Sequence, residues 1–255
     1  MKWVRKCLTE WRVALMLLTR LPVGRIGDTV PDLAAVLWAF PLVGILVGGV
    51  IAGSYIILHL LGLPVFLAAI LALTAGLIVT GGLHEDGLAD CADGFGGGKA
   101  RAQKLTIMKD SQVGSFGVLA LIILMSARMA ALTNLPATAN TIILIVTLAM
   151  ISRLMMVFYL YVLPAARTNG LGNQASNPEL VSVLAATVIC IPALMYCGNV
   201  IVPSLITATG TALGFAWLAK RQVGGQTGDV CGACQLLSET AGWVIMAGMI
   251  TSGGK

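Results

Sequence analysis

The chain has 255 residues, of which 58% are hydrophobic and only 11% are charged, and its mean hydropathy is +0.92. Soluble globular domains contain about 25% charged residues, so this composition excludes an ordinary soluble domain. The 30 glycines follow no fixed period, which excludes collagen, and the dominance of apolar residues excludes a disordered chain. The net charge of +5 comes from a few basic segments between apolar ones, so no nucleic-acid partner is expected.

Residues 1–20 predict an amphipathic helix that lies in the membrane interface. Trp3, Trp11 and Leu15 recur at helical spacing, whereas Arg5 and Arg12 lie elsewhere on the helix. Charged residues interrupt this segment, so a cleavable signal peptide is not expected. A short solvated helix is the alternative.

Seven apolar segments follow, and they are continuous rather than alternating. Backbone groups cannot remain unpaired in lipid, so such segments favour transmembrane helices. The last segment is weaker and can be partly interfacial because it contains Asp229, Gln235 and Glu239. We therefore predict one all-α catalytic domain over residues 1–255, a polytopic membrane bundle of about seven spanning helices. The segments are residues 33–61, 63–83, 114–133, 138–163, 180–198, 200–219 and 227–250.

The distribution of basic residues predicts the orientation in the membrane. The turns near residues 62, 134–137 and 198–203 contain no Lys or Arg. Under the positive-inside rule the opposite side is cytoplasmic. We expect a multi-pass protein of the cell inner membrane with its active-site loops in the cytoplasm. The basic side carries the N-terminal segment together with Lys99, Arg101, Lys104, Lys109, Arg167, Lys220 and Arg221.

An acidic stripe follows the second apolar segment. Asp86, Asp90 and Asp93 are spaced i, i+4, i+7, which places them on one face of a helix. Carboxylates about 6 Å apart repel by roughly 2–3 kcal/mol, so three of them favour a bound divalent cation such as Mg²⁺. A solvated acidic loop is the alternative. His84 precedes the stripe and can be a general base, a phosphate contact or a structural residue.

Three further segments contain candidate site residues. Lys109 is a candidate phosphate contact, and Asp110 or Ser111 can instead cap the following helix. The loop 164–179, with Asn173, can bind a ribose or base or be an ordinary loop. Asp229 is a second acidic point, either a metal ligand or a residue favoured by the helix dipole. The run Gly94–Phe–Gly–Gly–Gly98–Lys99 lacks the spacing of a phosphate-binding P-loop.

Charged residues inside the apolar segments are expected to face the bundle interior. Arg153 and Glu239 lie about 14 and 18 Å from the inner ends of their helices, and we predict that they pair. Arg128 lies near an outer end, where it can snorkel to the interface. The six cysteines, including the Cys231–Cys234 pair, lack partner ligands for a metal site and are interpreted as packing residues.

Several motifs, taken in order, resemble the cobalamin synthase family, the adenosylcobinamide-GDP ribazoletransferases. The similarity runs over essentially the whole chain, and its two most specific strings begin at Gly81 and at Gly224. The CxxC pair does not belong to the family pattern. The matching motifs are Thr19–Arg20–Leu21–Pro22, Phe40–Pro41–Leu42–Val43–Gly44, Gly81–Gly82–Leu83–His84–Glu85–Asp86–Gly87–Leu88–Ala89–Asp90, Met108–Lys109–Asp110–Ser111, Gly170–Leu171–Gly172 and Gly224–Gly225–Gln226–Thr227–Gly228–Asp229.

The resemblance implies the last assembly step of the nucleotide loop of adenosylcobalamin. α-Ribazole or its 5′-phosphate attacks adenosylcobinamide-GDP, GMP leaves, and Mg²⁺ is the expected cofactor. By this resemblance the metal ligands are Asp86, Asp90, Asp93 and Asp229. The implied catalytic residues are His84, Lys109 and Asp110. The implied substrate-binding residues are Glu85, Ser111, Arg153, Asn173 and Gln226.

Other functions remain as alternatives at this point. A membrane prenyltransferase needs a second acidic stripe, and a CDP-alcohol phosphotransferase needs a second carboxylate pair; the sequence has neither. A transporter should carry its acids near the bilayer midplane rather than at one face. The lipid bilayer is an expected partner, and a homo-oligomer or a complex with other corrinoid enzymes is left open.

Overall fold

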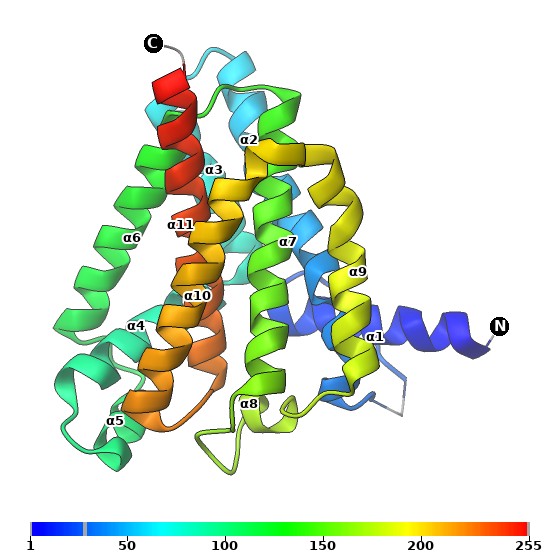
Figure 1. Cartoon of the computed structure of the whole chain (residues 1–255), viewed down its shortest axis with the longest axis vertical. Coiled ribbons are helices and arrows are strands. Elements are labelled where there is room, and N and C mark those ends of the chain that lie inside the picture. The colour runs from blue at the N-terminus through cyan, green and yellow to red at the C-terminus, as the bar shows by residue number, and fades with distance from the viewer. Residues whose placement is uncertain (1, 28–29, 254–255) are drawn as a thin grey trace.

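The computed structural model describes residues 2–27 and 30–253, and this part of the chain is helical apart from loops and one isolated β-bridge. Figure 1 shows most long helices running along the long axis of the molecule. The predicted all-α bundle is confirmed. Its long helices are α2 (Phe40–Leu60), α3 (Val65–Thr80), α6 (Ser115–Thr133), α7 (Ala139–Val162), α9 (Leu180–Cys197), α10 (Val202–Val223) and α11 (Gly228–Gly253).

The helices are long and apolar enough for a multi-pass membrane protein. In residues 2–27 and 30–253, five helical stretches could cross a membrane, or six if the bent pair formed by α3 and α4 (Leu83–Gly97) is one span. One of the five is the 44-residue stretch Leu180–Val223, which contains α9, the short η2 (Gly198–Ile201) and α10. Figure 1 shows α9 and α10 running in opposite directions. The count of seven spans stays a prediction.

The first helix, α1 (Lys2–Leu18), lies across the direction of the long helices (Figure 1). Its inner face packs on η1 (Leu33–Ala39), where the buried carboxylate of Glu10 accepts a hydrogen bond of 2.8 Å from Trp38 Nε1. Trp3 and Leu8 remain exposed on the other face. This crosswise, two-faced helix has the form expected of an interfacial segment.

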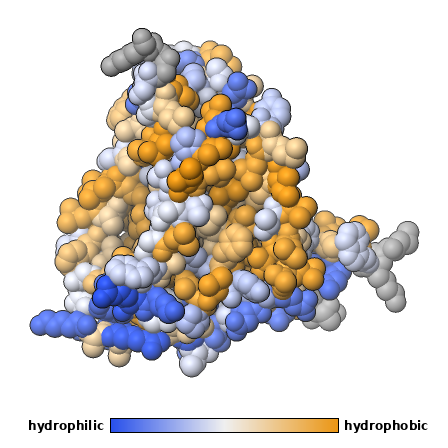
Figure 2. Space-filling model, viewed as in Figure 1, coloured by the Kyte–Doolittle hydropathy of each residue, from blue (hydrophilic) through white to orange (hydrophobic). Residues whose placement is uncertain are grey.

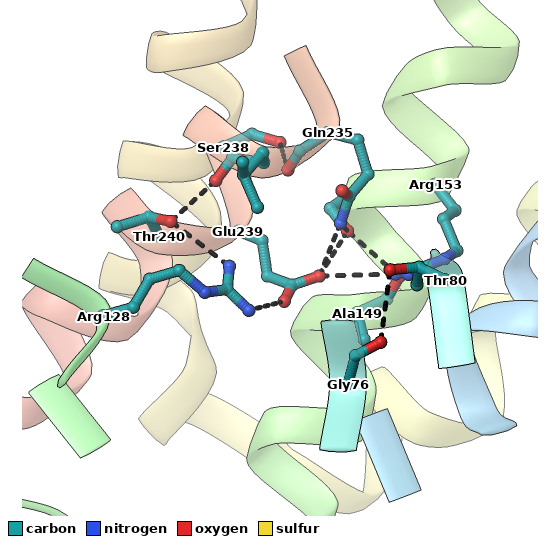
Figure 3. Close-up of polar contacts among 11 residues, drawn as sticks. Gly76, Thr80, Arg128, Ala149, Arg153, Gln235, Ser238, Glu239 and Thr240 are labelled. Atoms are coloured by element: carbon teal, nitrogen blue, oxygen red, sulfur yellow. Dashed lines mark hydrogen bonds and ion pairs between the residues drawn. The ribbon is translucent and has the colours of Figure 1, made fainter. Parts of the chain in front are cut away.

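The centre of the bundle contains a buried cluster of charged and polar side chains, shown in Figure 3. Glu239 on α11 accepts from Arg153 on α7 at 3.3 Å, which confirms the predicted pair. Arg128 on α6 pairs with Glu239 at 2.9 Å and lies over the Trp243 ring at 4.2 Å. The prediction that Arg128 snorkels was wrong, because its guanidinium has these partners inside the bundle and is buried.

Polar residues gather at one end of the molecule, below a broad hydrophobic surface in Figure 2. Helices α4, α5 (Arg101–Ile107) and α8 (Leu171–Gln174) lie at this polar end, together with the loop between α10 and α11 (Figure 1). All six cysteines are free thiols, and Cys231 and Cys234 are buried in the packed core. The interpretation of Cys231 and Cys234 as packing residues is confirmed.

Candidate active site

The acidic helix α4 is set at a right angle to the helix before it by two consecutive glycines. Gly81 and Gly82 have φ angles of +69° and +71°, a left-handed conformation that residues with a Cβ rarely adopt. The axes of α3 and α4 therefore meet at 89°. When α3 crosses the bilayer, α4 runs along its surface and presents the acidic stripe there.

The three acids of the stripe have different environments. Asp86 is exposed, Asp90 is half-buried and Asp93 is buried. The two carboxylate oxygens of Asp93 accept hydrogen bonds from the backbone N–H groups of Gly114, at 2.7 Å, and Gly117, at 2.9 Å. Asp93 thereby satisfies the start of α6, and this negative charge is favoured at a helix N-terminus.

This arrangement corrects the capping role proposed for the loop before α6. Asp110 accepts only from the nearby Gln112 N–H, at 3.1 Å, and the cap residue of α6 is Gly114. Asp110 and Ser111 therefore do not cap α6, because the carboxylate of Asp93 from α4 occupies those N–H groups.

Asp229 is brought to α4 from the other end of the chain. It lies in the first turn of α11, where Thr227, rather than Asp229, accepts the Val230 N–H at 3.2 Å. Asp229 Oδ2 accepts from Thr227 Oγ1 at 3.2 Å and pairs with Arg167 at 3.4 Å. A Cβ on Gly87 would lie 2.8 Å from the Asp229 carbonyl oxygen, so only glycine allows this approach of α4 to α11.

A cavity of about 240 Å³ lies at this junction, and we call it the site cavity. Its wall is apolar on the side of α1, α2 and α7, and polar where the loops of the polar end meet α4. Five of the predicted site residues line it together: His84, Asp86, Asn173, Gln226 and Asp229. The structure thus brings these five residues, which are far apart in the chain, to one cavity, and their role as a site stays a prediction.

Two loops are tied together beside the cavity. The backbone of Gln226 pairs with the 164–166 loop through two hydrogen bonds. The Gln226 N–H donates to Pro164 O at 2.9 Å, and the Ala166 N–H donates to Gln226 O at 2.8 Å. The Gln226 side chain is buried and donates to Gly172 O at 2.9 Å. Asn173 donates to Thr168 O at 3.0 Å. Both amides thus hold the loops in place while also lining the cavity.

The acids produce an electrostatic environment suited to a cation. Burial, then the charges of Asp229 and Asp86, raise the pKa of Asp90 to about 7. In the part of the chain that the structure describes, no three His, Cys, Asp or Glu residues converge closely enough to hold a metal ion. Mg²⁺ commonly takes one or two carboxylates and completes its shell with water and substrate phosphate, so Asp86 and Asp229 fit as its donors.

His84 is a buried, uncharged imidazole at the wall of the site cavity. It is buried at the start of α4, lines the site cavity, and its Nε2 has no hydrogen-bond partner among the described residues. Burial and the positive charges of Arg153 and Arg128 hold its pKa well below the usual 6.5. The imidazole is therefore neutral at pH 7.

Several predicted site residues lie outside the site cavity. Lys109, Asp110 and Ser111 are exposed in the turn between α5 and α6. Glu85 and Arg153 line a separate internal cavity of about 20 Å³ beside Glu239. The structure thus gives Arg153 an ion-pair partner in the bundle, and it does not place these five residues around the cavity with Asp86 and Asp229.

Arg167 was not assigned a role from the sequence, yet it is the basic side chain in the site cavity. It pairs with Asp229 and also donates to Leu105 O at 3.1 Å. Its position as the one charged residue between Leu163 and Asn177 was the available signal. Arg101, one of the basic residues on the predicted cytoplasmic side, donates to the carbonyls of Val223, at 2.7 Å, and Ala166, at 3.1 Å.

Comparison with known proteins finds relatives that match nearly the whole chain. A family profile described as Cobalamin-5-phosphate synthase matches residues 10–247. An adenosylcobinamide-GDP ribazoletransferase of Mesorhizobium japonicum is 38% identical over 238 residues, which cover 93% of this chain and 92% of the relative. Proteins of the same name from Bradyrhizobium diazoefficiens and Chlorobaculum tepidum are each 40% identical to this chain over 245 residues. Each match covers 92% of this chain, and the matches cover 92% and 93% of the two relatives, respectively. No solved structure matches the chain. The chain belongs to the cobalamin synthase family.

Proposed function

We propose that this protein joins α-ribazole, or its 5′-phosphate, to adenosylcobinamide-GDP and releases GMP. The relatives named above carry this activity in their names, and the match covers more than nine-tenths of the chain. The observation that carries the proposal is the site cavity, which Asp86 and Asp229 line together although they lie 143 residues apart in the sequence. Attack on a diphosphate needs oxygen donors that hold a metal ion, and it needs the attacking hydroxyl to be held in position.

The reaction replaces a phosphoanhydride bond with a phosphate ester bond. A ribose hydroxyl oxygen of α-ribazole bonds to the β-phosphorus, and the bond from that phosphorus to the oxygen bridging to GMP breaks. Asp86 and Asp229 would hold Mg²⁺, which would neutralise charge on the diphosphate oxygens, and the charge of the neighbouring Asp90 would add to the attraction for the cation. His84 accepts the hydroxyl proton, because it is neutral and lines the same cavity.

Arg167 and the two amides complete the site. Arg167 keeps Asp229 in place and lies in the cavity as a cation for phosphate oxygens. Asn173 and Gln226 hold the loops that form the polar wall and offer hydrogen bonds to a nucleoside. Lys109 lies in an exposed turn, so Arg167 replaces it here as the proposed phosphate contact.

The test is a direct assay of GMP release. Protein purified in lipid nanodiscs is incubated with adenosylcobinamide-GDP, α-ribazole and Mg²⁺, and GMP and the corrinoid product are quantified. We expect equal amounts of both products, their loss with EDTA, and their loss in Asp86→Asn. Absence of GMP release from wild-type protein, under conditions where a family relative is active, would contradict the proposal.

We further propose that the polar end faces the cytoplasm of the cell that carries this protein in its inner membrane. The basic residues of α5, the 164–170 loop and the end of α10 lie at this end (Figures 1 and 2). A cysteine at Lys109 should react with a membrane-impermeant maleimide only in inverted vesicles, and one at Asn134 only in right-side-out cells. The reverse pattern would contradict this orientation.

A further inference from the structure

A second cavity adjoins the site cavity and shares Asp86 with it. This cavity has a volume of about 610 Å³, and we call it the α1 cavity because the end of α1 forms one wall. Its other walls come from the corner between α3 and α4 and from α6 with the loop before it. Thr19, Arg20 and Asp86 supply its polar groups, and Met16, Val113 and Leu121 supply apolar surface. Met16 and Val113 are about half exposed, at 48% and 53%, so the cavity reaches the protein surface.

Arg20 is held at the wall of this cavity by its backbone and by the glycine corner. Its N–H donates to Val79 O at 2.7 Å, which joins the segment after α1 to the end of α3. A Cβ on Gly81 would lie 2.6 Å from Arg20 Cγ and would also contact Nε, so the guanidinium stem lies directly on this glycine. The glycine corner that turns α4 is therefore also the surface that positions Arg20.

The charge of Arg20 is available to a ligand. Four ion pairs occur within residues 2–27 and 30–253, and none of them involves Arg20. A guanidinium beside a candidate metal-binding carboxylate is the combination that recognises a diphosphate, because the planar fork donates two parallel hydrogen bonds to phosphate oxygens. Neither the proton-accepting role of His84 nor the loops of the site cavity uses Arg20.

The two cavities differ in size, access from the surface and charge, and the two substrates differ in the same properties. The site cavity is the smaller, and its apolar wall with amides on the other side suits an aromatic base joined to a ribose. The α1 cavity is the larger, reaches the surface and contains Arg20, which has no ion-pair partner within residues 2–27 and 30–253. A corrinoid nucleotide has a bulky ring that must remain outside and a charged arm that must enter.

We propose that the α1 cavity binds the diphosphate arm of the corrinoid nucleotide through Arg20, and that the site cavity binds the benzimidazole nucleoside. This inference rests on the proposed function. Asp86 lines both cavities, so the assignment places the diphosphate and the attacking hydroxyl on the two sides of one carboxylate. The corrin ring then rests against α1 at the membrane surface.

The experiment separates the two substrates. GMP release in nanodiscs is measured with one substrate varied while the other is saturating. Arg20→Ala should raise KM for adenosylcobinamide-GDP about tenfold or more and change KM for α-ribazole less than about twofold, as expected for loss of a charge-assisted contact. Asn169→Ala, on the rim of the site cavity, should raise only the KM for α-ribazole. Arg5→Ala, exposed on α1 and outside both cavities, is the matched control and should change neither KM.

A second variant and a binding measurement guard against misfolding and inactivity. Val113→Trp narrows the α1 cavity from an exposed position and should also raise only the KM for the corrinoid. Equilibrium dialysis of adenosylcobinamide-GDP without α-ribazole reports binding without turnover, and Arg20→Ala should bind more weakly. If wild-type protein releases no GMP, the proposed function fails, whereas dialysis still tests the role of Arg20.

Two results would overturn the inference. One is an equal rise in both KM values, or a rise only for α-ribazole, in Arg20→Ala and Val113→Trp. The other concerns a lipid phosphate, which offers the same oxygens as a diphosphate. The rate of GMP release is therefore compared between nanodiscs of phosphatidylcholine and nanodiscs that also contain phosphatidylglycerol. If Arg20→Ala changes only this difference in rate and leaves both KM values unchanged, Arg20 binds lipid instead.

Discussion

Replacing Glu239 with glutamine should destabilise the bundle strongly. The carboxylate accepts from four side chains: Arg128 at 2.9 Å, Arg153 at 3.3 Å, Ser152 at 2.9 Å and Gln235 at 2.7 Å (Figure 3). At an effective dielectric of about 20, an ion pair near 3 Å contributes about 5–6 kcal/mol before desolvation is subtracted. Removing one partner of a buried pair costs about 3–5 kcal/mol, because the other charge remains buried. Here two guanidinium groups would remain.

Thermal unfolding of the purified protein measures this effect. A loss of about 3–5 kcal/mol corresponds to a fall in Tm of about 10 °C for a chain of this size. A neutral hydrogen bond between membrane helices contributes only about 0.6 kcal/mol, so a fall this large would identify charge as its cause. Adding Arg128→Met to Glu239→Gln should restore part of the Tm, because it removes the repulsion between the two arginines.

The matched control is Glu179→Gln, an exposed residue at the start of α9, whose Tm should stay within about 2 °C of wild type. If Glu239→Gln also stays within about 2 °C, the carboxylate does not stabilise the arginines and the reasoning fails. If the double variant is less stable than Glu239→Gln alone, repulsion between the arginines is not the cause of the loss.

Three further predictions concern the acids of the site. Asp86→Asn and Asp229→Asn should each lower kcat about 100-fold or more and raise the Mg²⁺ concentration needed for GMP release, with little change in Tm; retained activity would exclude them as ligands. Asp93→Asn should instead lower the unfolding free energy by about 1–3 kcal/mol, because an amide cannot accept from both the Gly114 and Gly117 N–H groups. If Asp93→Asn instead raises the Mg²⁺ concentration needed for GMP release and leaves Tm unchanged, Asp93 is a metal ligand. Because Asp90 has a pKa of about 7, the Mg²⁺ concentration for half-maximal activity should rise up to about tenfold per pH unit below pH 7. Asp90→Asn should remove this dependence, and a flat profile from pH 6 to 8 in wild type would contradict it.

The helical architecture could be predicted from the sequence because lipid leaves the backbone few alternatives. Continuous apolar segments must form helices where no water is available for pairing, and the basic loops mark one end. The convergence of Asp86 and Asp229 could also be predicted, since both acids follow or precede apolar helices on the basic side.

The remaining features depend on contacts between distant segments. Arg128 was assigned to the interface from its position in α6, whereas its partner Glu239 lies 111 residues later. Asp93 follows the spacing of the acidic stripe, but its hydrogen bonds go to the start of α6, 21 and 24 residues away. Helical periodicity defines a face and not the neighbour that covers it. The direction of α4 depends on two φ angles at Gly81 and Gly82, which composition does not reveal.

The contact at Gly87 has a consequence for the Mg²⁺ that we propose Asp86 and Asp229 bind. Helices α4 and α11 touch backbone to backbone there, without space for a methyl group, so the acids on the two helices share one rigid support. Mg²⁺ binds oxygen at about 2.0–2.1 Å, whereas Ca²⁺ binds it at about 2.3–2.6 Å. If α4 and α11 cannot move apart, the carboxylates that they carry favour the smaller ion, Mg²⁺. Gly87→Ala would add a Cβ at this contact, separate the two helices and weaken the preference for Mg²⁺ over Ca²⁺, although it replaces no ligand.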